Sequence, residues 1–143
     1  MRLEDKLAIY EIIARYSYTW DAKDADGFAQ LFVEEAVWEL VGPEVTQPQL
    51  HLESRTAIHA WAMQSFQGRL ADIHTRHHQT GVLFDELTVD TARTRTMVLI
   101  THQGATEAVP RLTLSGVYYD QWRKTQAGWQ FAHRTLRHDR STP

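Results

Sequence analysis

Three side chains in this sequence could together move protons near neutral pH. Asp21 directly follows Trp20 at the end of an amphipathic segment, His77 lies early in a β-like segment, and His102 ends the next one. An aspartate that accepts the proton of one imidazole nitrogen fixes the tautomer and leaves the other nitrogen as a general base. Apolar surroundings can shift the pKa of either group toward the working pH. These residue types therefore predict acid–base chemistry.

Each of these residues also has a structural interpretation. A histidine on an apolar sheet face is most often a core residue that is hydrogen-bonded to backbone or water. Asp21 could end the first helix or cap the next one, although a carboxylate at a helix C-terminus is mildly unfavourable. Parity places His102 on one face with Val98 and Ile100. In an antiparallel pair the far ends of the two strands lie at opposite edges unless the register is offset, so the pattern does not place His77 beside His102.

Length and composition limit the possible classes of protein. The chain has 143 residues, of which 43% are hydrophobic and 23% are charged, so we expect one domain over 1–143, with a core at about 3–136 and a polar tail at 137–143. With no cysteine, it can have neither a disulfide framework nor a thiolate nucleophile. A net charge of −3 without a basic stripe predicts no nucleic-acid partner. Acidic residues near the N-terminus and the lack of long apolar runs predict no signal peptide, no membrane partner and a cytoplasmic location.

The eight histidines do not form a recognisable metal motif. His77 and His78 would point to opposite faces of a strand, and His74-x-x-His77 has no cysteine or second pair beside it. No glycine-rich loop suits a phosphate or dinucleotide. We therefore predict no metal and no cofactor. We expect four further histidines to lie at the surface or at the rim of a pocket: His51, His59, His133 and His138.

Hydrophobic periodicity predicts helices first and long strands last. The expected helices cover residues 3–21, 25–32 and 54–68, and the expected strands cover 36–41, 75–84, 91–102, 112–122 and 129–136, with a hairpin turn at 124–128. The face of the first helix should hold Leu3, Leu7, Tyr10, either Ile13 or Ala14, Ser17 and Trp20, widened by Ile9, Ile12 and Tyr16. This order indicates an α+β fold in which an antiparallel sheet, covered by helices on one face, curves into a cone with a pocket.

Aromatic side chains could line such a pocket. Trp38, Trp61, Tyr118, Tyr119, Trp122 and Trp129 are candidates, although most aromatics at strand spacing belong to the core. The residues that we expect to bind a substrate are Tyr16, Trp20, Trp38, Trp61, Phe66 and Tyr118.

Seven short segments of the chain each resemble a motif of one known protein family. They are the segments 9–16, 20–24, 28–32, 55–58, 75–77, 115–120 and 128–134. In this order and spacing, the chain resembles the nuclear transport factor 2-like superfamily, in its SnoaL-like and scytalone dehydratase-like branch, over about residues 3–136. Gly81 stands where many members carry asparagine.

The resemblance implies a cone-shaped α+β barrel in which a curved, mixed or antiparallel sheet wraps around N-terminal helices and encloses an apolar pocket, usually in a homodimer or homotrimer. It also implies an active site of Asp21, His77 and His102, with the aspartate paired to the second histidine. Trp20 stands where scytalone dehydratase has a tyrosine. Arg134 matches a pocket arginine of other relatives and could stabilise developing negative charge. Alternatively, Arg134 forms a salt bridge with an acid such as Asp21 or Asp120.

Two classes of function follow. The first is a cofactor-independent lyase or isomerase, dehydratase-like, that acts on a small apolar cyclic, polyketide-like or steroid-like substrate, with His77 as the base, or with Asp21 as the base as in ketosteroid isomerase-like members. Dehydration, isomerisation, cyclisation and dehydrohalogenation all begin with the same proton abstraction. The second is a non-catalytic small-molecule-binding or assembly module of the same fold. A weaker third possibility is the small subunit of a ring-hydroxylating oxygenase.

Overall fold

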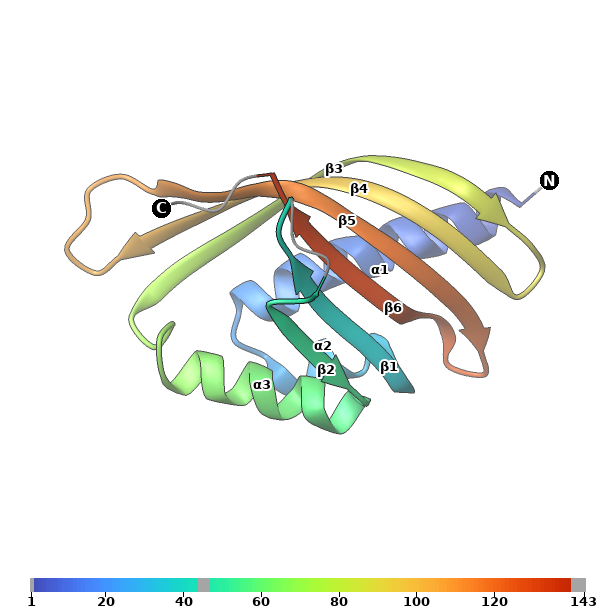
Figure 1. The fold of residues 1–143 in the computed structure, drawn as a ribbon, viewed down its shortest axis with the longest axis horizontal. Coiled ribbons are helices and arrows are strands. Elements are labelled where there is room, and N and C mark those ends of the chain that lie inside the picture. Colours follow the sequence, from blue (N-terminus) through green and yellow to red (C-terminus); the bar gives the residue numbers. More distant parts are fainter. Residues whose placement is uncertain (1, 44–46, 140–143) are drawn as a thin grey trace.

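The computed structural model describes residues 2–43 and 47–139, which form three helices and one six-stranded sheet. The helices are α1 (Leu3–Asp21), α2 (Ala25–Ala29) and α3 (Arg55–Gln67). The strands are β1 (Phe32–Val41), β2 (Leu50–Glu53), β3 (Ile73–Leu87), β4 (Thr91–Gly104), β5 (Arg111–Thr125) and β6 (Gly128–His138) (Figure 1). The α+β class that was predicted from the order of helices and strands is confirmed.

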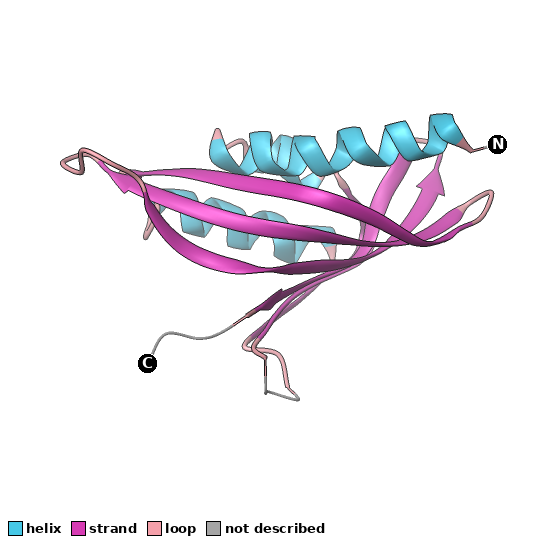
Figure 2. Cartoon of the chain, turned by 90° about the horizontal axis from the view of Figure 1, so that it is seen from above, coloured by secondary structure: helices cyan, strands magenta, loops and turns pink. Residues whose placement is uncertain are grey.

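The sheet is curved and does not close on itself. Its strand order is β2-β1-β6-β5-β4-β3, so that β2 and β3 form its two edges. The long strands β3, β4 and β5 bend together, and α1 runs along them (Figure 2). The sheet is mixed, because β1 and β6 pair in parallel whereas the other neighbouring strands are antiparallel. This agrees with the curved, mixed or antiparallel sheet that the resemblance implies, whereas the antiparallel sheet expected from the order of the elements does not include this one parallel pair. The long connection between β1 and β6, which includes α3, allows this arrangement.

Helix α1 buries only part of the face that was predicted for it. Ile9, Ile13, Tyr16, Ser17 and Trp20 are buried, at helical spacings of three and four. The first part of the predicted stripe is wrong, because three of its members are exposed: Leu3, Leu7 and Tyr10. Residues three or four apart share a face, so a stripe centred on Tyr16 and Trp20 turns these three side chains toward solvent.

Capping residues explain where the other helices begin. The side chain of Asp24 accepts a hydrogen bond from the backbone N–H of Gly27 at the start of α2, and that of Ser54 accepts one from Ala57 at the start of α3. Helix α2 is shorter than predicted, since the chain already enters β1 at Phe32. Strand β2 was not predicted, because its apolar–polar alternation extends over only four residues.

The C-terminal strand is longer than predicted. Arg137 and His138, which were assigned to a polar tail, belong to β6, and His138 is buried. The surface or rim position predicted for this histidine is therefore wrong, since it is buried and does not line the cavity described below. Its Nε2 atom lies 3.2 Å from the side-chain oxygen of Gln49. Residues 140–143 of the predicted tail lie outside the described residues.

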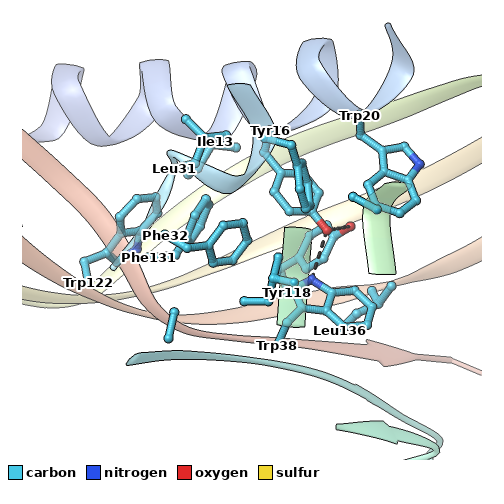
Figure 3. Packing of buried hydrophobic residues seen from close by; sticks show 14 of the residues in the cluster. Ile13, Tyr16, Trp20, Leu31, Phe32, Trp38, Tyr118, Trp122, Phe131 and Leu136 are labelled. Carbon is cyan, nitrogen blue, oxygen red and sulfur yellow. Dashed lines mark hydrogen bonds between the residues drawn. The ribbon is translucent and has the colours of Figure 1, made fainter. Parts of the chain in front are cut away.

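The core between helices and sheet is rich in aromatic side chains (Figure 3). Within it lies an ion pair between Arg134 and Asp120, whose side chains are both completely buried. The Nε of Arg134 donates a hydrogen bond to Asp120 Oδ1 at 2.9 Å. Burial raises the pKa of Asp120 to about 6, although the Arg134 charge opposes this shift. The carboxylate is therefore still mainly ionised at pH 7 and holds the guanidinium in place.

Replacement of Asp120 by asparagine should destabilise the fold strongly. Removing one partner of a buried ion pair leaves an uncompensated charge, which costs about 3–5 kcal/mol of unfolding free energy. Denaturant unfolding of the Asp120→Asn variant measures this loss. The matched control is Asp85→Asn, which removes an exposed carboxylate that also binds an arginine, Arg95, on the neighbouring strand. The control should have a much smaller effect; equal effects of the two variants would contradict the prediction.

Candidate active site

Asp21 and His77 form a directly hydrogen-bonded pair. Asp21 Oδ1 lies 2.8 Å from His77 Nδ1, and the two side chains are only 6% and 7% exposed. The carboxylate also accepts hydrogen bonds from the Thr75 hydroxyl at 2.7 Å and from the His77 backbone N–H at 3.0 Å. A carboxylate only accepts, so Nδ1 carries a proton, and in the neutral imidazole Nε2 has the free lone pair.

The end of α1 and the start of β3 bring this pair together. Asp21 is the last residue of α1, and two residues later the Lys23 ammonium donates a hydrogen bond to the Ile73 backbone oxygen at 2.8 Å. Lys23 adopts a positive φ of 58°, which turns the chain sharply after the helix. Because β3 is an edge strand, the free N–H of His77 is available to the Asp21 carboxylate.

The electrostatics of this pair favour an ionised aspartate. Burial by itself would raise the pKa of Asp21, but the hydrogen bonds from His77 and Thr75 outweigh it and hold the pKa below its usual value. Asp21 is therefore a carboxylate throughout the neutral range. It can fix the imidazole tautomer and stabilise an imidazolium if one forms.

His102 lies next to this pair on the adjacent strand, but it is not the partner of Asp21. Thr75 pairs with His102 and His77 with Ile100, so the two histidines are diagonal neighbours on one face. The pairing implied by the family resemblance, Asp21 with His102, is replaced by Asp21 with His77. The strand pattern left open how the two histidines lie; they are neighbours because in an antiparallel hairpin the start of β3 lies against the end of β4.

The environment of His102 favours its neutral form. Burial lowers the pKa of His102, and nearby positive groups, including Arg69 and Arg111, lower it further. Within the described ranges its ring has no hydrogen-bond partner. At neutral pH, His102 is thus an uncharged imidazole at the wall of the cavity.

His77 and His102 both line a cavity of about 420 Å³ between the helices and the sheet. Five of the six residues that were expected to bind a substrate also line it: Tyr16, Trp20, Trp38, Trp61 and Tyr118. Phe66 is not among the lining residues, because it packs behind Trp20 with ring centroids 4.7 Å apart. The indole of Trp61 packs on both Trp20 and Trp38, at 4.7 and 4.4 Å, which gives the cavity a continuous aromatic wall.

Sequence reasoning missed much of the lining. The residues in question are Leu40, Leu50, Arg69, Leu70, Thr113, Leu114 and Leu136, together with Ile100, which was placed on the His102 face but not in a pocket. Strand alternation could have suggested Leu40, which shares a face with Trp38. Arg69 follows the third helix, and nothing in its sequence context indicates a pocket position. A wider concavity of about 810 Å³ on the opposite side of the sheet contains none of the three predicted acid–base residues.

Arg134 lies below the cavity and does not line it. Its side chain is fully buried, and its guanidinium carbon lies 3.4 Å from the ring centroid of Tyr118 and 4.1 Å from that of Tyr16. Its Nη2 donates to the Gln79 side-chain oxygen at 2.6 Å. Of the two interpretations of Arg134, the structure favours the salt bridge, with Asp120 as the partner. Direct contact with a bound molecule would require the two tyrosine rings to move.

The remaining histidines lie away from the cavity. His51 on β2 and His133 on β6 both bond to the Glu39 carboxylate on β1. The distances are 2.9 Å from His51 Nδ1 and 2.5 Å from His133 Nε2. His59 bonds to Asp26 near the surface. Within residues 2–43 and 47–139, no group of three or more histidine and acidic side chains has a geometry that could hold a metal ion.

This geometry can be compared with known proteins. A family model described as the SnoaL-like domain matches residues 1–135. The chain belongs to the SnoaL-like domain family. The predicted resemblance is therefore confirmed at the level of family and fold. No curated protein is similar enough to this SnoaL-like chain to count as a match.

Solved structures agree with this assignment. Rv3472 from Mycobacterium tuberculosis, a protein of unknown function, is 28% identical with a TM-score of 0.82 over 99% of this chain and 75% of its own. A candidate scytalone dehydratase from Novosphingobium aromaticivorans is 25% identical, with a TM-score of 0.81. The match covers 99% of this chain and 88% of that protein. An NTF2-like protein with a cystatin-like fold from the same organism is 24% identical, with a TM-score of 0.78. The match covers 95% of this chain and 82% of that protein, and it supports the fold alone.

None of the helices in the described part of the SnoaL-like chain combines the length and the apolar character that crossing a membrane requires.

The pKa of His102 should lie below the ordinary histidine value of 6.5, and the pKa of His51 should lie above it. Burial lowers the pKa of His102 below 6.5, whereas the hydrogen bonds that exposed His51 donates to the Glu53 and Glu39 carboxylates raise the pKa of His51 above 6.5. Because the folded pKa of His102 is below its unfolded value, its protonation destabilises the fold as the pH falls below about 6.5. NMR titration of the ring protons measures both values in one sample. Titration of His102 above 6.5 would contradict the structure.

Proposed function

We propose that this SnoaL-like protein is a cofactor-independent lyase or isomerase in which His77 abstracts a proton from carbon. The observation that carries the proposal is the buried Asp21–His77 pair, whose free Nε2 belongs to a residue lining an apolar cavity. A similar candidate scytalone dehydratase supports the lyase class. A positioned base in a dry cavity can perform this chemistry without a cofactor.

The geometry favours His77, not Asp21, as the base. Asp21 has both oxygens engaged by hydrogen bonds and is not among the residues that line the 420 Å³ cavity. A carboxylate that accepts three hydrogen bonds with a lowered pKa is a weak base. Asp21 is therefore a positioning residue, which holds the imidazole in one tautomer and stabilises its charge after proton transfer.

His102 would act on the other side of the reacting group. As a neutral imidazole it can donate a ring N–H to an oxygen of the substrate, or to a leaving hydroxyl, in the same cavity. The cavity walls are mostly aromatic and aliphatic, which suits a small apolar ring. After proton abstraction, loss of water or migration of a double bond would complete the reaction.

The central test is exchange of hydrogen for deuterium beside a carbonyl group. Wild-type protein should accelerate exchange into at least one member of a panel of small cyclic ketones in D2O, followed by NMR, and His77→Ala should reduce this rate by about 10²–10⁴-fold. His78→Ala is the matched control, because His78 neighbours His77 but is not in the cavity lining. Full exchange by His77→Ala would refute the histidine base. Saturable ketone binding without any exchange would favour the binding-module alternative.

Asp21→Asn tests the positioning role separately. We expect the exchange rate to fall by about 100-fold, since the imidazole loses its fixed orientation. ¹⁵N NMR of the wild-type protein should show the His77 proton on Nδ1, and this preference should disappear in the variant. A purely structural role would leave the tautomer unchanged. If Asp21 itself were the base, activity would instead survive in His77→Ala and vanish in Asp21→Asn.

A further inference from the structure

The lining of the 420 Å³ cavity contains one permanent charge, the guanidinium of Arg69. The other described lining residues are apolar, aromatic, hydroxyl-bearing or histidine, and none of them is an acid or a lysine. Arg69 is itself exposed, so it lies at the rim of the cavity, where the lining meets solvent. A single positive charge at the rim of an apolar cavity suits a molecule with an apolar body and one negatively charged end.

The guanidinium of Arg69 has little to bind within the protein. Its one hydrogen bond runs from Nη2 to the Ser65 hydroxyl at 3.4 Å, which is long for such a bond. Six other arginines in the described part of the chain form ion pairs with carboxylates. Within the same ranges, Arg69 has no acidic partner. Most of its five N–H groups are therefore left to water or to a bound molecule.

The backbone on both sides of Arg69 is fixed. The N–H of Leu70 donates to the Ser65 oxygen at 3.0 Å, and that of Ala71 donates to the Gly68 oxygen at 3.1 Å. An arginine just beyond a helix C-terminus is favourable in itself, because it lies at the negative end of the helix dipole. Yet the Arg69 side chain donates to none of the carbonyl oxygens of α3, all of which the structure describes. The helix end therefore does not explain its place in the cavity lining.

Arg69 lies close enough to the acid–base residues to act on them through its charge. The pKa of His102 is lowered mainly by burial and then by three positive groups, whereas one acid opposes this shift. The positive groups are His77, Arg69 and Arg111, and the acid is Asp21. A molecule whose negative end binds Arg69 would therefore extend into the cavity toward the two histidines.

We propose that the substrate of this protein is a small ring compound that carries a carboxylate, and that Arg69 binds this group at the rim of the cavity. A planar carboxylate can accept two parallel hydrogen bonds from a guanidinium. A phosphate with two negative charges would favour a second cation, but nearby Arg111 is already paired with Glu107. The inference rests on the proposed function in taking this cavity as the substrate site. It assigns the end of the substrate that does not react, so Arg69 determines specificity.

The test compares 2-naphthoate with 2-naphthamide, which have nearly the same shape but differ in charge. Wild-type protein should bind 2-naphthoate about tenfold more tightly in a calorimetric titration, as expected for a charge-assisted pair of hydrogen bonds. Arg69→Gln should remove this preference, while its binding of 2-naphthamide shows that the cavity is intact. Equal affinities in the wild type, no binding of 2-naphthoate, or a preference that persists in Arg69→Gln would overturn the proposal.

Arg76→Gln is the matched control. Arg76 precedes His77 on β3, has no carboxylate partner among the described residues and does not line the cavity. This variant loses the same charge as Arg69→Gln, so it should keep the tenfold preference. Loss of the preference in both variants would show a general attraction of anions to the protein instead of contact with Arg69, against the proposal.

A second readout uses the wild-type protein alone. Both compounds exclude water from the cavity, but only 2-naphthoate brings a negative charge to Arg69. The pKa of His102, followed by NMR, should therefore be higher in the 2-naphthoate complex than in the 2-naphthamide complex. Equal pKa values would contradict the proposal.

His77→Ala separates this inference from the proposed function. The variant should lose deuterium exchange but keep the preference for 2-naphthoate, because Arg69 is unchanged. Wild-type protein that prefers 2-naphthoate but catalyses no exchange would support the carboxylate site and refute the base. Exchange by the wild type without any preference for 2-naphthoate would refute the carboxylate site and leave the base in place.

Discussion

The carboxylate of Asp21 is the contact on which the arrangement of the cavity depends. It satisfies three donors at once: the Thr75 hydroxyl, the His77 imidazole and the His77 backbone N–H. The last donor belongs to an edge strand and would otherwise face solvent or another chain. One side chain thus joins the end of α1 to the start of β3, orients the imidazole and closes a short stretch of sheet edge.

A second polar layer lies beneath the apolar lining. Asp120 and Arg134 carry opposite charges in the core, and Gln79 connects Arg134 to α1 by donating to the Ile13 backbone oxygen and the Ser17 hydroxyl. Buried ion pairs seldom add stability compared with apolar packing, so they are better explained by what they position. Here the guanidinium supports the rings of Tyr16 and Tyr118. The cavity is apolar at its surface and charged one layer below.

Much of the fold could be predicted from sequence because its elements are long and periodic. The long strands and the first and third helices agree with the predicted segments to within a few residues. The errors have local causes. Strand β2 has an apolar–polar alternation of only four residues, and the parallel β1–β6 pair depends on how the chain crosses over. The predicted face of α1 was too wide at its N-terminal end, where Leu3, Leu7 and Tyr10 are exposed.

For the site, the sequence by itself determined the residue types: an aspartate at a helix end, two histidines on successive strands and aromatics at strand spacing. Only the tertiary structure decided their partners. Hairpin pairing brought His102 beside His77, and the chain direction after α1 gave Asp21 to the first histidine. The tertiary structure also placed Arg134 behind the rings of Tyr16 and Tyr118 instead of in the cavity. Hydrogen-bond partners depend on distances across elements far apart in the chain, and local spacing carries no information about those distances.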